Sequence, residues 1–194
     1  PENPKYHIEK NSGEHTERVI DALNKDDVKL NLATLFHDIG KSVTPEEDYP
    51  HHKGHDVLGI DLVKSISKRL KMPNEYRDFC VYTCKHHDKF KYISIMKLPK
   101  LYDFVKELTY KFKNRDDFVG LYKVVHADNS AKLINCSENF IKELDNQNKI
   151  DSIFDIMKDI HVEDFPELKN LSGEKLGKIY RDLCIEKLKK EMEK

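Results

Sequence analysis

The sequence has no tryptophan, and it has only seven glycines and seven prolines among its 194 residues. No apolar run approaches the roughly 20 residues that a membrane-spanning helix needs. These shortages exclude collagen-like, low-complexity and membrane-spanning proteins. Charge of one sign is not in excess either, because 34 lysines and arginines face 35 aspartates and glutamates. Proteins that bind nucleic acid through bulk charge are usually basic, so any such contact here is expected to be a local patch.

Cysteine is scarce and has no metal-binding or redox spacing. The four cysteines contain no C-x-x-C pair, so we expect buried, reduced thiols in a cytoplasmic protein, at Cys80, Cys84, Cys136 and Cys184. The opening Pro-Glu-Asn-Pro has none of the basic and apolar stretches of a signal peptide. Because it also lacks an initiator methionine, the chain is consistent with a fragment of a longer protein.

Apolar residues recur mostly at intervals of three and four, which predicts an all-α fold. The stripe of Leu58, Leu62, Ile66 and Leu70 indicates a helix over 55–70. Gly40 is suited to a left-handed cap, and we expect the helix that begins near residue 26 to stop there. The remaining helices are expected at 12–24, 73–86, 101–112, 118–128, 138–147, 151–160 and 174–193.

Histidine is abundant, with ten residues, and most of them lie near the ends of predicted helices. His37 and Asp38 follow an apolar helix as adjacent residues. Adjacent helical side chains point about 100° apart, so the imidazole can bind one ion while the carboxylate, with its two oxygens, bridges to another. A mixed shell of this kind admits several divalent metals. The alternative is a helix end at which the histidine interacts with the helix dipole.

Two further histidine pairs lie at or near the ends of predicted helices. His52 and His55 are separated by two residues that include a glycine, and a turn there can bring both imidazoles to one side. Loop histidines that face solvent are the alternative. His86 and His87 end another predicted helix, and we expect His86 to face solvent.

Taken together, these residues resemble the pattern of the HD superfamily of metal-dependent phosphohydrolases. The resemblance is carried, in chain order, by His15, His37-Asp38, Gly54-His55-Asp56-Val57-Leu58-Gly59, His87 and Asp128. In that family a helical bundle holds one or two divalent ions at its centre. The resemblance implies a first ion held by His15, His37, Asp38 and Asp128. It implies a second ion that shares Asp38 and binds His55 and His87.

A closer resemblance is to the HD domain of bacterial CCA-adding tRNA nucleotidyltransferases, over about residues 5–190. It is carried by Asn11-Ser12-Gly13-Glu14-His15-Thr16, Phe36-His37-Asp38-Ile39-Gly40-Lys41 with Thr44-Pro45, Pro50-His51-His52-Lys53-Gly54-His55-Asp56, Pro73-Asn74-Glu75-Tyr76-Arg77-Asp78 and Leu171-Ser172-Gly173-Glu174-Lys175-Leu176-Gly177. Ala127-Asp128 resembles a Glu-Ala-Asp of that domain, with His126 in place of the glutamate. The resemblance implies an HD-type bundle with a central metal site, formed by a phosphohydrolase domain at 1–131 and a helical tail at 132–194.

The same resemblance implies an activity. No Gly-Ser followed by an Asp-x-Asp pair occurs, so the nucleotidyltransferase half of those enzymes is absent from these residues. The implied activity is that of a metal-dependent phosphodiesterase and phosphatase, acting on 2′,3′-cyclic phosphates and 2′-phosphates of nucleotides or RNA ends in tRNA processing or RNA repair. The divalent ion is open among Mn, Ni, Co and Mg, although an imidazole-rich shell is less natural for Mg.

Three residues are candidates for catalysis or substrate binding beside Asp38. Lys41 can reach a phosphoryl oxygen as a point charge, or it balances the dipole of a helix end. His52 is a candidate for a contact that supports the metal ligands, or for donating a proton to the leaving oxygen. Arg77 can bind phosphate or form a structural ion pair with a neighbouring acid.

Two alternative functions stay open. A free-standing HD phosphohydrolase, acting in RNA end healing or on nucleotides, would have the same site without a polymerase partner upstream. A non-catalytic domain that positions tRNA would bind RNA with steep salt dependence and without turnover. Its basic patch would be formed by Lys97, Lys100, Lys106, Lys111 and Lys113, for which a solvated helix face is the ordinary explanation.

Overall fold

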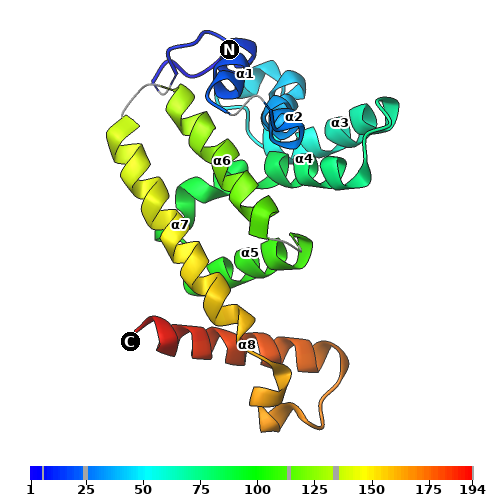
Figure 1. Ribbon diagram of the computed structural model, residues 1–194, viewed down its shortest axis with the longest axis vertical. Helices are drawn as coiled ribbons and strands as arrows, with labels where there is room; N and C mark the ends of the chain where they lie inside the picture. Colours follow the sequence, from blue (N-terminus) through cyan, green and yellow to red (C-terminus); the bar gives the residue numbers. More distant parts are fainter. Residues whose placement is uncertain (6, 24–25, 113–114, 133–135, 194) are drawn as a thin grey trace. The chain divides into compact units, whose positions relative to one another are not determined.

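The fold is all-α, as the computed structural model in Figure 1 shows. The structure describes residues 1–5, 7–23, 26–112, 115–132 and 136–193. Within these ranges it contains eight α-helices and no strand, which confirms the all-α prediction. In the same described ranges, none of the helices combines the length and the apolar character needed to cross a membrane.

Most of the α-helices lie where the apolar periodicity of the sequence predicts a helix. Asn11 and Asp27 cap the first two, because each side chain accepts a hydrogen bond from a backbone N–H in the first turn. The helices are α1 (Ser12–Asp21), α2 (Val28–Phe36), α3 (His55–Arg69), α4 (Asn74–His86), α5 (Leu98–Lys111), α6 (Arg115–Ala131), α7 (Cys136–Lys158) and α8 (Gly173–Met192). Between them lie the short 3₁₀ helices η1 (Ile39–Val43), η2 (Glu46–Asp48), η3 (His87–Ile95), η4 (Val162–Asp164) and η5 (Pro166–Leu168).

Two compact units divide the chain, and the first comprises Pro1–Tyr92 with Asn114–Leu144. In this unit α4 packs against α2 and α3, and α6 packs against α1 and α2. Its core contains buried apolar side chains such as Ala33, Val63 and Phe79. Removal of these side chains from water is the main force that stabilises the unit.

The second unit comprises Ile93–Lys113 with Asp145–Lys194. There α8 packs against α5, and the Tyr180 hydroxyl donates a hydrogen bond of 3.1 Å to the backbone oxygen of Ile160. Its core contains Leu101, Val105 and Leu188. The predicted domain division at 1–131 and 132–194 stays a prediction, because compactness alone does not show which segment folds independently.

The structure corrects the two short helices expected at 138–147 and 151–160. They are parts of one helix, α7, which continues across residues 147–151 and contains Asn146 and Asn148. Asparagine has a low helix propensity, which favoured a break, but Asn146, Ile150 and Ile153 are buried. Burial of these side chains outweighs propensity, which is worth at most about 0.7 kcal/mol for each such residue.

Gly40 does not form the left-handed cap that we expected. Helix α2 ends at Phe36, and Gly40 lies in η1 with a φ outside the left-handed region. Glycine is needed at position 40 for close packing instead, because a Cβ atom there would lie 1.9 Å from the backbone oxygen of His55. A Cβ atom at Gly59 would likewise lie 2.4 Å from the Sγ atom of Cys84. The two glycines therefore allow η1, α3 and α4 to approach one another closely.

The described cysteines are buried thiols, in agreement with the expectation of unpaired cysteine. Cys80, Cys84 and Cys184 form no disulfide, and the side chain of Cys136 lies outside the described residues. Burial raises the pKa of Cys80 and of Cys84 to about 12. Neither of these two thiols is therefore ionised at neutral pH.

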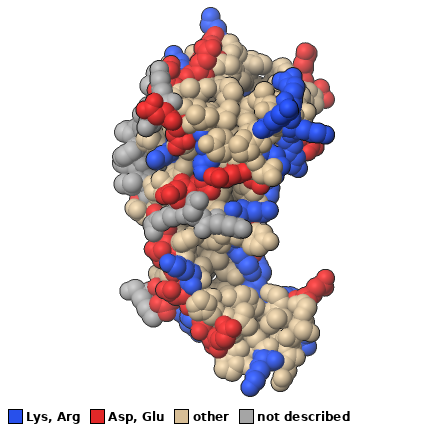
Figure 2. All heavy atoms as spheres, turned by 45° about the vertical axis from the view of Figure 1, so that its right-hand side comes forward, with Lys and Arg blue, Asp and Glu red and all other residues tan. Residues whose placement is uncertain are grey.

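The surface carries charges of both signs. Figure 2 shows acidic and basic side chains spread over one face, with other residues between them. Of the lysines considered for a basic patch, Lys106 places its ammonium over the rings of Tyr102 and Tyr180, at 5.6 and 5.7 Å from the ring centroids. Lys113 lies outside the described residues.

Candidate metal centre

The six candidate ligands come from separate elements of the first unit and meet in one place. His15 lies in the first turn of α1, and Asp128 lies in α6. The others stand at helix ends: His37 and Asp38 follow α2, His55 begins α3, and His87 follows α4. Each of the six is at most 8% exposed. The structure therefore brings together all the residues that the resemblance implied as ligands, and their role as ligands stays a proposal.

Asp38 lies at the centre of this cluster, and its two carboxylate oxygens face different histidines. Its Oδ2 atom is 3.3 Å from Nε2 of His37. Its Oδ1 atom is 3.1 Å from Nε2 of His55 and 3.2 Å from Nε2 of His87. A carboxylate with histidines at both oxygens can bridge two cations.

His15 and Asp128 complete the side of the cluster that contains His37. Nε2 of His15 is 2.8 Å from Oδ1 of Asp128, and Nε2 of His37 is 3.9 Å from the same oxygen. One group of potential ligand atoms, from His15, His37 and Asp38, lies within 4.8 Å of one another, and so does a second group, from Asp38, His55 and His87. Two adjoining groups that share Asp38 could each hold a metal ion.

Backbone carbonyls fix the ring orientation of three of these histidines. The Nδ1 atoms of His37, His55 and His87 lie 2.6, 2.9 and 3.0 Å from backbone oxygens three residues earlier in the chain. A carbonyl oxygen only accepts hydrogen bonds, so each Nδ1 carries the proton and donates it. The Nε2 lone pair of each ring is then directed towards Asp38, where a cation can use it.

Several buried atoms of the cluster form no hydrogen bond with the described residues. They are Nε2 of His37, Nε2 of His55 and Oδ1 of Asp38. A buried polar atom without a partner costs about 1–3 kcal/mol of stability. A cation held between these lone pairs and the carboxylate would remove that cost, so the residues present fit a divalent metal.

Charges around Asp38 favour its ionised form. Burial acts to raise the pKa of Asp38, but neighbouring groups that include the Lys41 ammonium outweigh burial and hold the pKa well below its usual range. Nζ of Lys41 is 2.7 Å from Oδ2 of Asp38 and 2.8 Å from Oε1 of Glu2. Asp38 therefore carries its negative charge at neutral pH, as a ligand for a cation must.

A pocket of about 240 Å³ connects the cluster to the surface. It is lined by four of the candidate ligands and by two lysines, which are Asp38, His55, His87, Asp128, Lys41 and Lys132. Nζ of Lys132 is 2.7 Å from Oδ2 of Asp128. The pocket lining also includes Glu2 and Asp88, and both ammonium groups are paired with carboxylates. An anionic phosphoryl group would therefore bind there together with a cation held by the cluster.

Two residues that we expected to act on the substrate are not brought to this pocket. The ring of His52 is buried, and its nitrogens contact the Thr44 hydroxyl at 2.6 Å and a backbone carbonyl at 3.0 Å. Arg77 forms an ion pair of 2.6 Å with Asp78. It precedes His87 by ten residues along α4, about 15 Å of helix axis. Neither side chain lines the pocket.

The expectation that His86 faces solvent is wrong. Its side chain is 0% exposed and stacks on the ring of Tyr82, with the ring centroids 5.4 Å apart. Both members of the pair are therefore buried, and only His87 contacts Asp38. The polarity of histidine suggested an exposed position for His86, but a histidine ring can be buried in a core when it has packing partners.

Sequence reasoning missed four charged residues around the cluster, which are Glu2, Glu9, Asp88 and Lys132. Oδ2 of Asp88 is 3.3 Å from Nε2 of His55, and Glu9 contacts Nδ1 of His15. Two of the four had a local signal. Asp88 directly follows the candidate ligand His87, and Lys132 lies one helical turn after the candidate ligand Asp128. The two glutamates precede α1 in a segment without periodicity, so no pattern marked them.

Comparison with known proteins agrees with this geometry. Residues 10–102 match the family model of the HD domain. A Multifunctional CCA protein of Herminiimonas arsenicoxydans is 42% identical over 89 residues, which cover 45% of this chain and 22% of that protein. A Multifunctional CCA protein of Xanthomonas campestris pv. campestris (strain B100) is 32% identical over 140 residues, which cover 69% of this chain and 33% of that protein. No solved structure matches.

These matches confirm the resemblance to the HD domain of CCA-adding enzymes. The chain spans between about a fifth and a third of the length of the curated relatives it matches. The match covers only one part of those relatives, so it does not assign their activities as whole proteins to this chain.

Proposed function

Because residues 10–102 match the HD domain family, we propose that this protein is a metal-dependent phosphohydrolase. We propose that it cleaves 2′,3′-cyclic phosphates and 2′-phosphates of nucleotides or RNA ends. The observation that carries the proposal is the position of Asp38, whose two oxygens face histidines of two different groups. We assign a first ion to His15, His37, Asp38 and Asp128, and a second ion to Asp38, His55 and His87.

The chemistry divides between the ions and the side chains of the pocket. Divalent ions at this cluster would neutralise charge on the phosphoryl group and make water a stronger nucleophile at neutral pH. Lys41 and Lys132 line the pocket and would attract the phosphoryl oxygens as point charges. Water gives up one proton to solvent and forms a new P–O bond while the bond to the ribose oxygen breaks, and that oxygen takes up a proton. His51 lines the pocket where His52 does not, so we assign the proton donor to His51.

The relatives support an RNA end as the substrate class. Both are named Multifunctional CCA protein, and we propose that tRNA is among the substrates of this chain. The matched segments cover a third or less of each relative. We therefore propose that this site works beside an upstream domain in a longer polypeptide.

The proposal is tested by a substrate panel. Nucleotides with 2′,3′-cyclic, 2′-, 3′- and 5′-phosphates are incubated with the protein and Mn²⁺, Ni²⁺, Co²⁺ or Mg²⁺ in turn. We expect at least one ion to support opening of the cyclic phosphate and release of 2′-phosphate. Failure of every ion with every substrate would overturn the proposal and favour an RNA-positioning domain, provided that RNA binds with a steep dependence on salt.

A matched pair of variants locates the activity. Asp38→Asn keeps the shape of the side chain but removes the charge that faces three histidines, so turnover is expected to fall to background while far-UV circular dichroism is unchanged. Asp61→Asn removes an equally charged group from α3, where the side chain is 94% exposed. The second variant is expected to turn over like the wild type. Equal activity in both variants would contradict the assignment of Asp38.

A further inference from the structure

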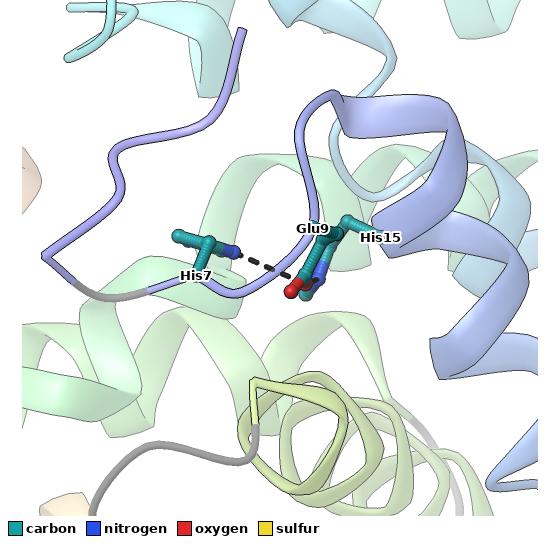
Figure 3. A group of neighbouring side chains, drawn as sticks. All are labelled: His7, Glu9 and His15. Carbon is teal, nitrogen blue, oxygen red and sulfur yellow. Dashed lines mark hydrogen bonds and ion pairs between the residues drawn. The ribbon is translucent and has the colours of Figure 1, made fainter.

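His15 differs from the other histidines of the cluster in what holds its ring. Whereas the other three donate from Nδ1 to backbone carbonyls, Nδ1 of His15 contacts Oε1 of Glu9. Figure 3 shows the Glu9 carboxylate beside the ring of His15, with a dashed line from it to the ring of His7. The side chains of Glu9 and His15 are 1% and 0% exposed, so bulk water does not replace this contact.

His15 has a carboxylate at each of its ring nitrogens. Its Nε2 atom is 2.8 Å from Oδ1 of Asp128, on the side away from Glu9. A neutral imidazole has one N–H and one lone pair, so it can donate to only one of the two carboxylates. If the proton stays on the side of Glu9, the Nε2 lone pair faces the negative oxygen of Asp128. The Lys132 ammonium, 2.6 Å from the same oxygen, offsets part of the repulsion, and a divalent cation bound by both atoms would remove the rest.

We propose that Glu9 is a positioning residue, which keeps the proton of His15 on Nδ1 so that Nε2 can bind a divalent cation together with Asp128. The inference rests on the metal centre of the proposed function. Glu9 lies one residue before the range 10–102 that matches the HD domain, so it stands outside that match. His7 supports its position, with Nδ1 3.3 Å from Oε1 of Glu9.

A competing arrangement is a separate ion bound directly by Glu9. Potential ligand atoms of His7, Glu9 and His15 lie within 4.8 Å of one another, and Oε2 of Glu9 is buried without a hydrogen bond to the described residues. Such an ion would use the Nδ1 lone pair of His15, while an ion beside Asp128 uses the Nε2 lone pair. One neutral imidazole cannot supply both lone pairs, because one nitrogen carries the proton. The geometry therefore favours the positioning role.

Metal affinity tests the role of Glu9 without reference to turnover. Zn²⁺ binding is measured by calorimetry for the wild type, Glu9→Gln and Glu9→Ala. Glutamine keeps an oxygen that accepts the Nδ1 proton, whereas alanine removes the acceptor. We expect Glu9→Ala to bind Zn²⁺ about 10–100-fold more weakly, the usual effect of losing such a partner, and Glu9→Gln to recover most of that loss. Wild-type affinity in Glu9→Ala would overturn the inference.

A control variant removes another carboxylate from the same part of the chain. The Glu14 carboxylate accepts hydrogen bonds from the backbone N–H of Lys10 and from the side-chain amide of Asn11. Glu14→Gln is expected to bind Zn²⁺ like the wild type. A loss as large as that of Glu9→Ala would show a general effect of charge or of local folding, and it would overturn a specific role for Glu9.

The proton position on His15 gives a second, independent readout. In ¹⁵N spectra of the Zn²⁺-loaded protein, we expect His15 to carry its proton on Nδ1, and we expect that preference to weaken in Glu9→Ala. Native mass spectrometry of His7→Gln distinguishes the positioning role from a separate ion bound by His7, Glu9 and His15. Loss of one bound ion in that variant would show such an ion and overturn the positioning role. If the wild type binds no Zn²⁺ at all, the metal centre itself fails, a result distinct from unchanged affinity in Glu9→Ala.

Discussion

Gly40→Ala is expected to damage both the packing and the metal centre. The added Cβ atom would lie 1.9 Å from the backbone oxygen of His55 and 2.7 Å from the backbone nitrogen of Gly59. An ordinary carbon–oxygen contact is about 3.3 Å or more, so η1 and α3 must separate by roughly 1.4 Å. Overpacking usually costs about 1–3 kcal/mol, and the obstacle here is backbone, so we expect about 2–3 kcal/mol.

That loss corresponds to a fall in Tm of about 4–12 °C, since each kcal/mol shifts Tm by about 2–4 °C in a chain of this size. Because Asp38 lies two residues before Gly40, the same movement should draw its carboxylate away from His55 and weaken metal binding. Gly177→Ala in α8 is the control, because nothing lies within 4 Å of the added atom. The free energy of unfolding of Gly177→Ala should rise by up to about 1 kcal/mol, because alanine has a higher helix propensity than glycine. The reasoning is refuted if thermal unfolding and Mn²⁺ titration show Gly40→Ala to be as stable as Gly177→Ala and to bind Mn²⁺ like the wild type.

Three further predictions concern the pocket and its surroundings. Tyr92 lines the pocket with 57% of its surface exposed, so Tyr92→Leu should raise KM for nucleotides by removing base stacking of about 1–3 kcal/mol, but not for ribose 2′-phosphate. An equal change for both substrates would contradict stacking. Arg77→Ala should leave kcat/KM unchanged, because its exposed ion pair lies away from the pocket; a large kinetic loss would show that the placement is wrong. Cys84 should react with a thiol reagent at pH 8 much more slowly in the native protein than in urea, since burial raises its pKa to about 12, and equally fast labelling would argue against that burial.

Much of the fold could be predicted from the sequence, because helices with a regular apolar stripe have a local signal. The stripe from Leu58 to Leu70 predicted the bounds of α3 to within a residue at each end, although Leu58 and Leu70 are exposed. The buried face of α3 is formed by His55, Gly59, Val63 and Ser67. The long helix α7 could not be predicted in the same way, because its asparagines favour a break and its continuity depends on burial of residues such as Ile150 and Ile153. Gly40 was misjudged for a related reason, since its close contact is with a residue fifteen positions later.

The candidate site was predictable only in part. Periodicity places His37 and His87 at helix ends, but it does not show that they meet, and the grouping of the six ligands came from the family resemblance. The roles assigned to His52 and Arg77 came from that resemblance and from residue type, and the structure keeps both side chains out of the pocket. No sequence pattern indicated Glu9, because glutamates are common near helix starts and its contact with His15 is known only from the structure.

The central claim is that Asp38 joins two groups of imidazole and carboxylate ligands into a site for divalent cations. Anomalous diffraction from crystals of the protein soaked in Mn²⁺ tests it most directly. We predict a strong anomalous peak within bonding distance of the Asp38 carboxylate, either beside His55 and His87 or beside His37 and Asp128, and its loss in Asp38→Asn. A map without a peak at Asp38, or an undiminished peak in the variant, would contradict the account.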